Sequence, residues 1–163
     1  MKVDLRSPDL LSMADLFQHE IQAILSRACQ LKIEPNPPSL QGKTLALLFE
    51  KPSLRTRVSF EVATLQMGGH AVHLGQTEVG TGVREPIADI GLLLSRVVDG
   101  IAYRTYTHEN LKELARCASV PVINALSDTE HPTQALADLL TVLEHRGVLK
   151  GVVISYIGDG NNV

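Results

Sequence analysis

Residues 100–126, GIAYRTYTHENLKELARCASVPVINAL, contain one complete repeat of the pattern that predicts the fold. Residues 100–106 and 120–126 are short apolar runs with the length and composition of buried strands. Residues 108–118, which lie between them, predict a helix. Because strands separated by one helix of about 10–15 residues form β–α–β units, this stretch predicts two parallel strands of one sheet.

The same alternation continues on both sides of this stretch. The further predicted strands are residues 44–50, 70–75 and 151–158, and the further predicted helices are residues 13–31, 54–67, 86–98 and 132–146. Ser12 is the expected N-cap of the first helix, and Pro86 lies in the first turn of its helix. The alternation predicts an α/β fold, in which helices flank a parallel sheet on both faces.

The bulk composition limits the classes of function. The chain has 163 residues, of which 44% are hydrophobic and 20% charged, and its formal net charge is −3. This charge gives no general attraction for nucleic acids or acidic membranes, so neither is an expected partner. Any anion-binding site must therefore be local.

Several features of the sequence bear on the location of the protein. No run of about 18 apolar residues is present, and the N-terminal residues lack the apolar segment of a signal peptide, so we expect neither a membrane span nor secretion. Cys29 and Cys117 both lie inside predicted helices. Two such cysteines are typical of reduced, mostly buried thiols, and the expected location is the cytoplasm.

Residues 151–163, GVVISYIGDGNNV, predict a strand followed by a glycine turn. We expect this segment to begin a second domain, so that residues 1–150 form the first domain and the chain is a fragment of a longer one. A dinucleotide-binding fingerprint is an alternative for Gly158 and Gly160. Valine replaces the third glycine of that pattern at position 163, which argues against it.

Polar side chains follow three of the predicted strands, and ligands of open parallel sheets bind at the carboxyl ends of strands. The first group lies in FEKPSLRTRVSFE, residues 49–61. Ser53 can cap the helix, and the free backbone N–H groups of residues 54–56 form an anion cradle, with Arg55 and Thr56 beside it. An arginine fork matches two phosphate oxygens. The alternative is that Arg57 pairs with Glu61 and Arg55 is solvated.

The second and third groups are Arg104, at the end of a strand, and the sequence His131-Pro132-Thr133-Gln134. Taken alone, Arg104 is more consistent with an ordinary strand-end arginine than with a site residue. Pro132 suits the first position of a helix, so His131 lies at the helix N-terminus. There the helix dipole lowers the pKa of the imidazole and favours a neutral ring that can donate to a carbonyl oxygen.

Together these groups favour binding of a small phosphorylated compound whose carbonyl group is polarised. No cluster has metal-ligand spacing, no serine lies in a nucleophile elbow, and no carboxylates converge, so we expect neither a metal nor a cofactor. The implied chemistry is direct attack by a second substrate, with the protein positioning the groups and stabilising charge. A phosphate- or carboxylate-binding sensor without turnover is the alternative of another class.

At these residues the chain resembles the aspartate/ornithine carbamoyltransferases. Their carbamoyl-phosphate domain carries Ser-Thr-Arg-Thr-Arg after the first strand, an arginine at the end of a later strand, and His-Pro-Thr-Gln at the start of a helix. The corresponding residues here are Ser53-Leu54-Arg55-Thr56-Arg57, Arg104 and His131-Pro132-Thr133-Gln134. Leu54 replaces the usual threonine. The stretches FEKPS, DGIAYRTY and HPTQALADLLT are more similar to the ornithine branch than to the aspartate branch.

The resemblance implies a carbamoyl-phosphate site. Ser53, Leu54, Arg55 and Thr56 would hold the phosphate. Arg104 and His131, with Thr56, would polarise the carbonyl oxygen, while Gln134 would contact the carbamoyl amide. The expected catalytic residues are Arg55, Thr56, Arg104 and His131, and the binding site would also include Pro132, Thr133 and Gln134.

The reaction implied by the resemblance is transfer of the carbamoyl group from carbamoyl phosphate to the side-chain amine of L-ornithine, giving L-citrulline and phosphate in arginine metabolism. Aspartate, putrescine and acetylornithine are alternative acceptors, because the acceptor site would lie in the second domain. The resemblance also implies a homo-oligomer built from trimers. The ornithine branch often has a glutamine that reaches a neighbouring subunit's site, and Gly80 stands at that position here.

Overall fold

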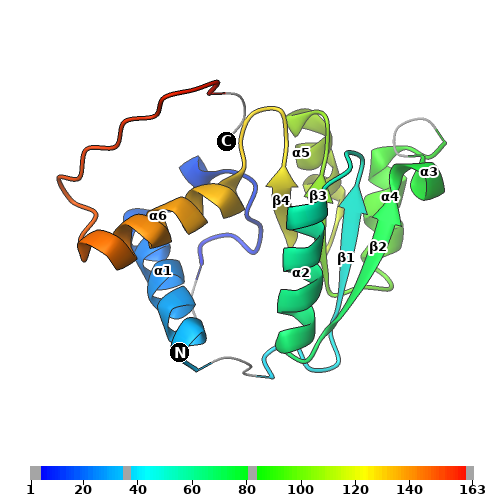
Figure 1. Ribbon diagram of the computed structural model, residues 1–163. Helices are drawn as coiled ribbons and strands as arrows, with labels where there is room; N and C mark the ends of the chain where they lie inside the picture. Colours follow the sequence, from blue (N-terminus) through cyan, green and yellow to red (C-terminus); the bar gives the residue numbers. More distant parts are fainter. Residues whose placement is uncertain (1–4, 35–37, 81–83, 161–163) are drawn as a thin grey trace.

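The computed structural model describes residues 5–34, 38–80 and 84–160. Within this part of the chain, four parallel strands form one sheet in the order β2-β1-β3-β4 (Figure 1). The strands are β1 (Thr44–Phe49), β2 (His70–Gly75), β3 (Gly100–Arg104) and β4 (Val122–Leu126). The helices are α1 (Gln18–Ile33), α2 (Leu54–Gln66), α3 (Gln76–Val79), α4 (Ile87–Leu94), α5 (His108–Cys117) and α6 (Pro132–Arg146). The predicted α/β class is confirmed.

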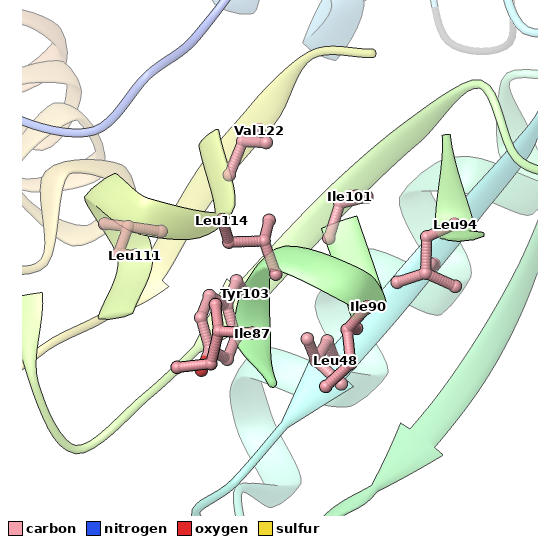
Figure 2. Close-up of a cluster of buried hydrophobic side chains, with 10 residues drawn as sticks. Leu48, Ile87, Ile90, Leu94, Ile101, Tyr103, Leu111, Leu114 and Val122 are labelled. Carbon is pink, nitrogen blue, oxygen red and sulfur yellow. The ribbon is translucent and has the colours of Figure 1, made fainter. Parts of the chain in front are cut away.

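Strands β1, β3 and β4 are largely buried on both faces because alternate residues are apolar on each side, whereas the edge strand β2 is partly exposed. On one face, Leu48, Ile101 and Tyr103 pack against α4 and α5 (Figure 2). On the other face, Leu47 and Ala102 belong to a smaller cluster that includes Phe60 of α2. A parallel sheet covered in this way requires apolar residues along the whole strand, which explains the continuous apolar runs in the sequence.

The N-terminal segment covers the edge of the sheet next to β4. The Leu10 amide donates to the Val122 carbonyl at 2.9 Å, and the Asn124 amide donates to the Leu10 carbonyl at 2.8 Å. These bonds satisfy backbone groups of an edge strand that would otherwise be unpaired. Sequence patterns did not predict this pairing, because the segment is too short to show a strand period.

Two predicted helices are shorter than expected. The pattern at residues 13–31 corresponds to a 3-10 turn, Met13–Asp15, capped by Ser12, and to α1, which begins only at Gln18. The Glu20 carboxylate, almost fully buried, accepts the Phe17 amide at 2.7 Å and so starts α1 at that point. Helix α4 ends at Leu94 rather than at residue 98, and Pro86 is its N-cap.

The short helix α3 was not predicted. It ends at Gly80, the position where the ornithine branch of the family often has glutamine. Gly80 has φ 63°, a left-handed conformation that favours glycine. A Cβ atom there would lie 2.6 Å from the Cβ atom of Arg84, so a side chain at this position would force that arginine to move.

The predicted strand at residues 151–158 does not form. This part of the chain has no regular structure (Figure 1). It leaves large apolar side chains exposed, such as Ile157 at 96%. A strand requires a neighbour to accept and donate its backbone hydrogen bonds, and no described strand lies beside this segment.

No helix in the described ranges combines the length and apolarity needed to cross a bilayer. Cys29 and Cys117 are free thiols. Both are partly buried.

Candidate functional site

The carboxyl ends of β1, β3 and β4 and the first turns of α2 and α6 surround a cavity of about 690 Å³. Its lining combines side chains from the three predicted groups with several that were not predicted: Ser53, Arg55, Thr56, Ser59, Phe60, Ala63, Arg104, Leu126, His131, Thr133, Gln134 and Ala137. The prediction that the three groups meet at one edge of the sheet is therefore confirmed.

The start of α2 is open toward the cavity. Ser53 occupies the N-cap position with an extended backbone, but its hydroxyl forms no capping hydrogen bond, so the expected side-chain cap is absent. The first N–H groups of a helix have no partner within the helix itself. No acidic residue lies in this first turn to offset the positive end of the helix dipole.

The two arginines of this turn have different surroundings. The Arg57 Nε atom donates to Glu61 at 2.9 Å, as the helical spacing predicted. Arg55 lines the cavity, and among the described residues it has no hydrogen-bond or ion-pair partner. Arg57 is therefore neutralised by its own helix, whereas the charge of Arg55 faces the cavity.

Arg104 enters the cavity from the end of β3. Its Nε atom is buried and is the one buried side-chain nitrogen or oxygen without a hydrogen-bond partner in the described ranges. Burial, and the nearby Arg55 guanidinium, lower the pKa of Arg104. Two guanidinium groups that destabilise each other, one of them with an unpaired buried donor, form a site for an anion or a carbonyl oxygen.

His131 lies at the N-terminus of α6 and is half-buried. Its pKa is lowered, first by burial and then by the Arg104 charge. The predicted direction is therefore confirmed, but the first cause is burial rather than the helix dipole. The ring nitrogen Nδ1 lies 3.1 Å from the Thr133 hydroxyl. When that hydroxyl donates to Nδ1, the neutral ring carries its proton on Nε2 and can donate it to a ligand.

Gln134 is fixed by a residue one turn later on the same helix. Its side-chain amide nitrogen donates to the Asp138 carboxylate at 2.9 Å. With one N–H engaged in this way, the carbonyl oxygen of Gln134 remains available to accept from a ligand N–H in the cavity.

Two of the predicted site residues do not line this cavity. Leu54 is 80% exposed and faces a separate depression on the other side of the β1–α2 loop, which it shares with His73 and Tyr106. Pro132 is buried as the first residue of α6 and is not part of the cavity lining. Either residue can therefore contribute to the cavity only through its backbone.

Several lining residues were not predicted from the sequence. Ser59 and Ala63 follow Arg55 at intervals of one helical turn, and Ala137 stands one turn after Thr133. Helical spacing from the predicted residues could have identified all three. Leu126 gave no such signal, because its place depends on the way β4 ends.

Leu126 has φ 132°, which makes it the one non-glycine residue with a positive φ in the described part of the chain. Conformations of this kind cost about 1–3 kcal/mol and persist only where the surrounding structure imposes them. The pairing of β4 with β3 is also irregular here. Tyr103 is opposite Asn124, whereas Arg104 is opposite Leu126, so Ala125 is an extra residue in β4.

The cavity lining contains no carboxylate. Across residues 5–34, 38–80 and 84–160, no three His, Cys, Asp or Glu side chains are grouped as metal ligands. The arrangement can therefore hold an anion with arginine, hydroxyl and backbone donors, and it can polarise a carbonyl group with Arg104 and His131.

The chain matches the family model described as aspartate/ornithine carbamoyltransferase, carbamoyl-P binding domain, over residues 8–144. It is 50% identical to an ornithine carbamoyltransferase of Anoxybacillus flavithermus, in an alignment that covers 99% of this chain and 52% of that protein. The corresponding protein of Thermus thermophilus is 54% identical, with 95% of this chain and 52% of that protein covered. The chain spans about half the length of the curated relatives it matches.

Solved structures give the same result. The crystal structure of ornithine carbamoyltransferase from Thermus thermophilus superposes with a TM-score of 0.92 at 54% identity, covering 96% of this chain and 55% of that one. The enzyme from Pyrococcus furiosus also has a TM-score of 0.92, at 50% identity, covering 95% of this chain and 51% of that one. An N-acetyl-L-ornithine transcarbamylase has a TM-score of 0.79 at 35% identity, covering 88% and 50%.

Proposed function

This chain belongs to the aspartate/ornithine carbamoyltransferase family, and on that basis we propose that it forms the carbamoyl-phosphate-binding part of an ornithine carbamoyltransferase. The proposed reaction transfers the carbamoyl group of carbamoyl phosphate to the side-chain amine of L-ornithine, giving L-citrulline and phosphate. The names of the similar proteins, at about half identity over nearly the whole chain, support ornithine as the acceptor.

The observation that carries this proposal is the composition of the cavity. Arg55 and Arg104 face a space that contains no carboxylate, and Arg104 keeps a buried donor unpaired. A buried N–H donor without a partner, close to a second cation, is unfavourable, so an anionic ligand would stabilise the site. An acyl phosphate satisfies both needs, because it brings a phosphate dianion and a carbonyl oxygen on one molecule.

The proposed roles follow from the position of each group. The phosphate lies at the start of α2, where Ser53, Arg55, Thr56 and the backbone N–H groups that include that of Leu54 donate to it. Arg104 and His131 donate to the carbonyl oxygen. Thr133 supports His131, and the carbonyl oxygen of Gln134 accepts from the carbamoyl amide.

The reaction needs no covalent intermediate with the protein. The amine nitrogen attacks the carbonyl carbon, a C–N bond forms, and negative charge develops on the carbonyl oxygen beside Arg104 and His131. The C–O bond to phosphate then breaks, phosphate leaves with the electron pair, and the nitrogen releases a proton. Donors that are already in place for the developing oxyanion lower the barrier, because they need no reorganisation.

We propose further that residues 1–150 form one domain and that residues 151–163 begin a second, acceptor-binding domain. A homotrimer is proposed as the basic assembly. Its support is a stripe of exposed apolar residues along α2, formed by Leu54, Val58, Val62 and Leu65. The free thiols Cys29 and Cys117 support a reducing compartment such as the cytoplasm.

The proposed function is tested with the complete polypeptide that contains this domain. It is incubated with carbamoyl phosphate and, in separate reactions, L-ornithine, N-acetyl-L-ornithine, L-aspartate or putrescine, while phosphate and the carbamoylated product are measured. We expect both products with ornithine. Turnover with another acceptor alone would reassign the acceptor, and binding of carbamoyl phosphate without any turnover would indicate a binding module.

A further inference from the structure

The end of β4 departs from regular strand geometry at the point where it reaches the cavity. Ala125 is an extra residue relative to β3, and Leu126 has φ 132°. Bulges of this kind occur next to active sites, where they redirect the following side chains. Strained residues persist when surrounding contacts impose them, and they cluster at functional sites. These observations raise the question of which contacts hold Leu126.

The contacts come mainly from Asn124, whose side chain is fully buried. Its Oδ1 atom accepts the Leu126 amide at 2.9 Å, and its Nδ2 atom donates to the Leu11 carbonyl at 2.9 Å. From the other side, the Leu126 carbonyl accepts the Thr105 amide at 3.0 Å. One amide side chain thus connects the strained residue to the N-terminal segment that covers β4.

The same side chain also reaches the loop that leads to α6. Asn124 Nδ2 lies 3.4 Å from the Glu130 carbonyl, and the Ser127 amide donates to that carbonyl at 3.1 Å. The Glu130 carboxylate in turn accepts the Met13 amide at 2.9 Å. The loop between Leu126 and His131 is therefore short and closed by hydrogen bonds, so the direction of the chain at Leu126 determines where the loop ends.

Leu126 lies between the two groups proposed to act on the carbonyl oxygen. It is the register partner of Arg104, and His131 follows it by five residues. All three line the cavity. A change in the backbone at Leu126 would therefore move His131 relative to Arg104. The start of α2 follows β1 rather than β4, so it would be unaffected.

We infer that Asn124 and the strained Leu126 form a positioning device that holds His131 opposite Arg104. Neither residue is a catalytic group. Asn124 imposes the backbone conformation of Leu126, and that conformation directs the closed loop so that the His131 ring faces the Arg104 guanidinium. This inference rests on the proposed function for its kinetic consequence, but the placement of His131 can be measured without turnover.

A packing role would have a different signature. If Leu126 only filled space and Asn124 only satisfied buried polar groups, replacing both would do more damage than replacing one. In a positioning device held under strain, glycine at position 126 adopts φ 132° without a Cβ penalty. When the Asn124 hydrogen bond is removed, a glycine at position 126 can keep this conformation without strain, whereas leucine moves away from it. Leu126→Gly should therefore restore part of the activity lost in Asn124→Ala.

The test uses the complete enzyme with the variants Asn124→Ala and Asn124→Ala/Leu126→Gly. We expect Asn124→Ala to lower kcat at least ~30-fold, within the range for displaced catalytic groups, with KM for carbamoyl phosphate changed by less than about threefold because the phosphate-binding turn is intact. We expect the double variant to recover about tenfold in kcat. The control Asn124→Ala/Leu92→Gly places the same change at an exposed leucine of α4, outside the cavity, and should show no recovery.

A second measurement does not depend on activity. In the wild-type protein, burial and Arg104 lower the pKa of His131. An NMR titration should show this pKa rising toward its ordinary value of about 6.5 in Asn124→Ala and falling again in the double variant. If Asn124→Ala does not fold, Leu126→Gly should melt at a higher temperature than Leu126→Ala, since only the glycine relieves the strain.

The outcomes separate the two proposals. A wild-type enzyme that transfers no carbamoyl group would contradict the proposed function, and the His131 titration would then decide the positioning role alone. A double variant no better than Asn124→Ala, with the pKa of His131 unmoved in both, would overturn the inference. So would a stable Leu126→Ala variant that melts above Leu126→Gly, because it would show that no strain is stored at this residue.

Discussion

Helices α2 and α6 both begin at the cavity, but only the start of α6 is held in place by the rest of the molecule. At the start of α2, Ser53 makes no capping bond and Arg55 has no described partner. At the start of α6, Pro132 is buried, His131 contacts Thr133, and the preceding loop is closed by hydrogen bonds. The proposed phosphate side of the site is thus open, and the proposed carbonyl side is already assembled.

This difference agrees with the chemistry proposed for each side. A cation at the positive end of a helix is unfavourable by about 0.3–1 kcal/mol, so the start of α2 is stabilised when an anion arrives. The carbonyl side must instead stabilise charge that exists only during the reaction, and donors for that purpose act best when they are fixed beforehand. Ligand binding should therefore order α2 more than α6.

The largest expected effect that separates these two regions comes from the two arginines of α2. Arg55→Ala in the complete enzyme should lower kcat/KM for carbamoyl phosphate by about 10³-fold, roughly 4 kcal/mol, because Arg55 faces the cavity unpaired. Arg57→Ala is the matched control, because Arg57 lies two residues further along the same helix. It loses only an exposed bond to Glu61, so steady-state kinetics should show less than a tenfold change.

Both variants should melt within a few degrees of the wild-type protein, since neither arginine is buried in the core. If Arg55→Ala retained kcat/KM while Arg57→Ala lost it, the two arginines would have the opposite roles, and the open side of the site would have been assigned wrongly.

The start of α6 can be tested through His131, whose lowered pKa should make the free energy of unfolding depend on pH. The pKa of His131 is lower in the folded protein than in the unfolded chain, so the unfolded state binds more protons as the pH falls below about 6.5. The free energy of unfolding should therefore be complete above that pH and decline as the pH falls toward the pKa of folded His131. Thermal melts of wild type and His131→Gln between about pH 8 and pH 5 measure it.

In His131→Gln this part of the decline should be missing, because glutamine does not titrate. Carboxylates with lowered pKa values, such as Glu20 and Asp99, add their own loss only at lower pH, below their ordinary values. Parallel melting curves for the two proteins across this window would show that His131 is not buried near a cation.

The smallest effect concerns the missing cap of α2. Ser53→Ala should change the free energy of unfolding by less than about 0.5 kcal/mol, because the hydroxyl makes no capping bond. Thr107→Ala, which removes a hydroxyl that caps α5, should cost about 1 kcal/mol. Chemical denaturation measures both. A cost for Ser53→Ala equal to that for Thr107→Ala would indicate a capped, preformed α2 in solution.

The comparison also shows how much of the site the sequence could predict. At α2 the pair of Arg57 with Glu61 could be predicted because it depends on spacing along one helix, whereas the expected Ser53 cap did not form. At α6 the direction of the His131 pKa shift was predicted from the helix start alone. The causes of this shift are burial and the charge of Arg104, which lies on β3. They depend on contacts between elements, so only the structure could identify them.

By itself, the sequence determined the alternation of strands and helices, the parallel sheet buried on both faces, and the three polar groups at its carboxyl edge. These features follow from the local period of apolar residues and from turn and helix-start residues, which act over a few positions. For the same reason the sequence sufficed to indicate the family, whose motifs lie at strand ends.

Only the tertiary structure decided the remaining features. The pairing of Leu10 with β4, the extra residue Ala125 and the conformation of Leu126 each depend on partners that are distant in sequence. The predicted strand at residues 151–158 failed because a strand needs a neighbour as well as an apolar pattern. Local patterns encode which face of an element is buried, whereas register, strain and the cause of a pKa shift arise from contacts between elements.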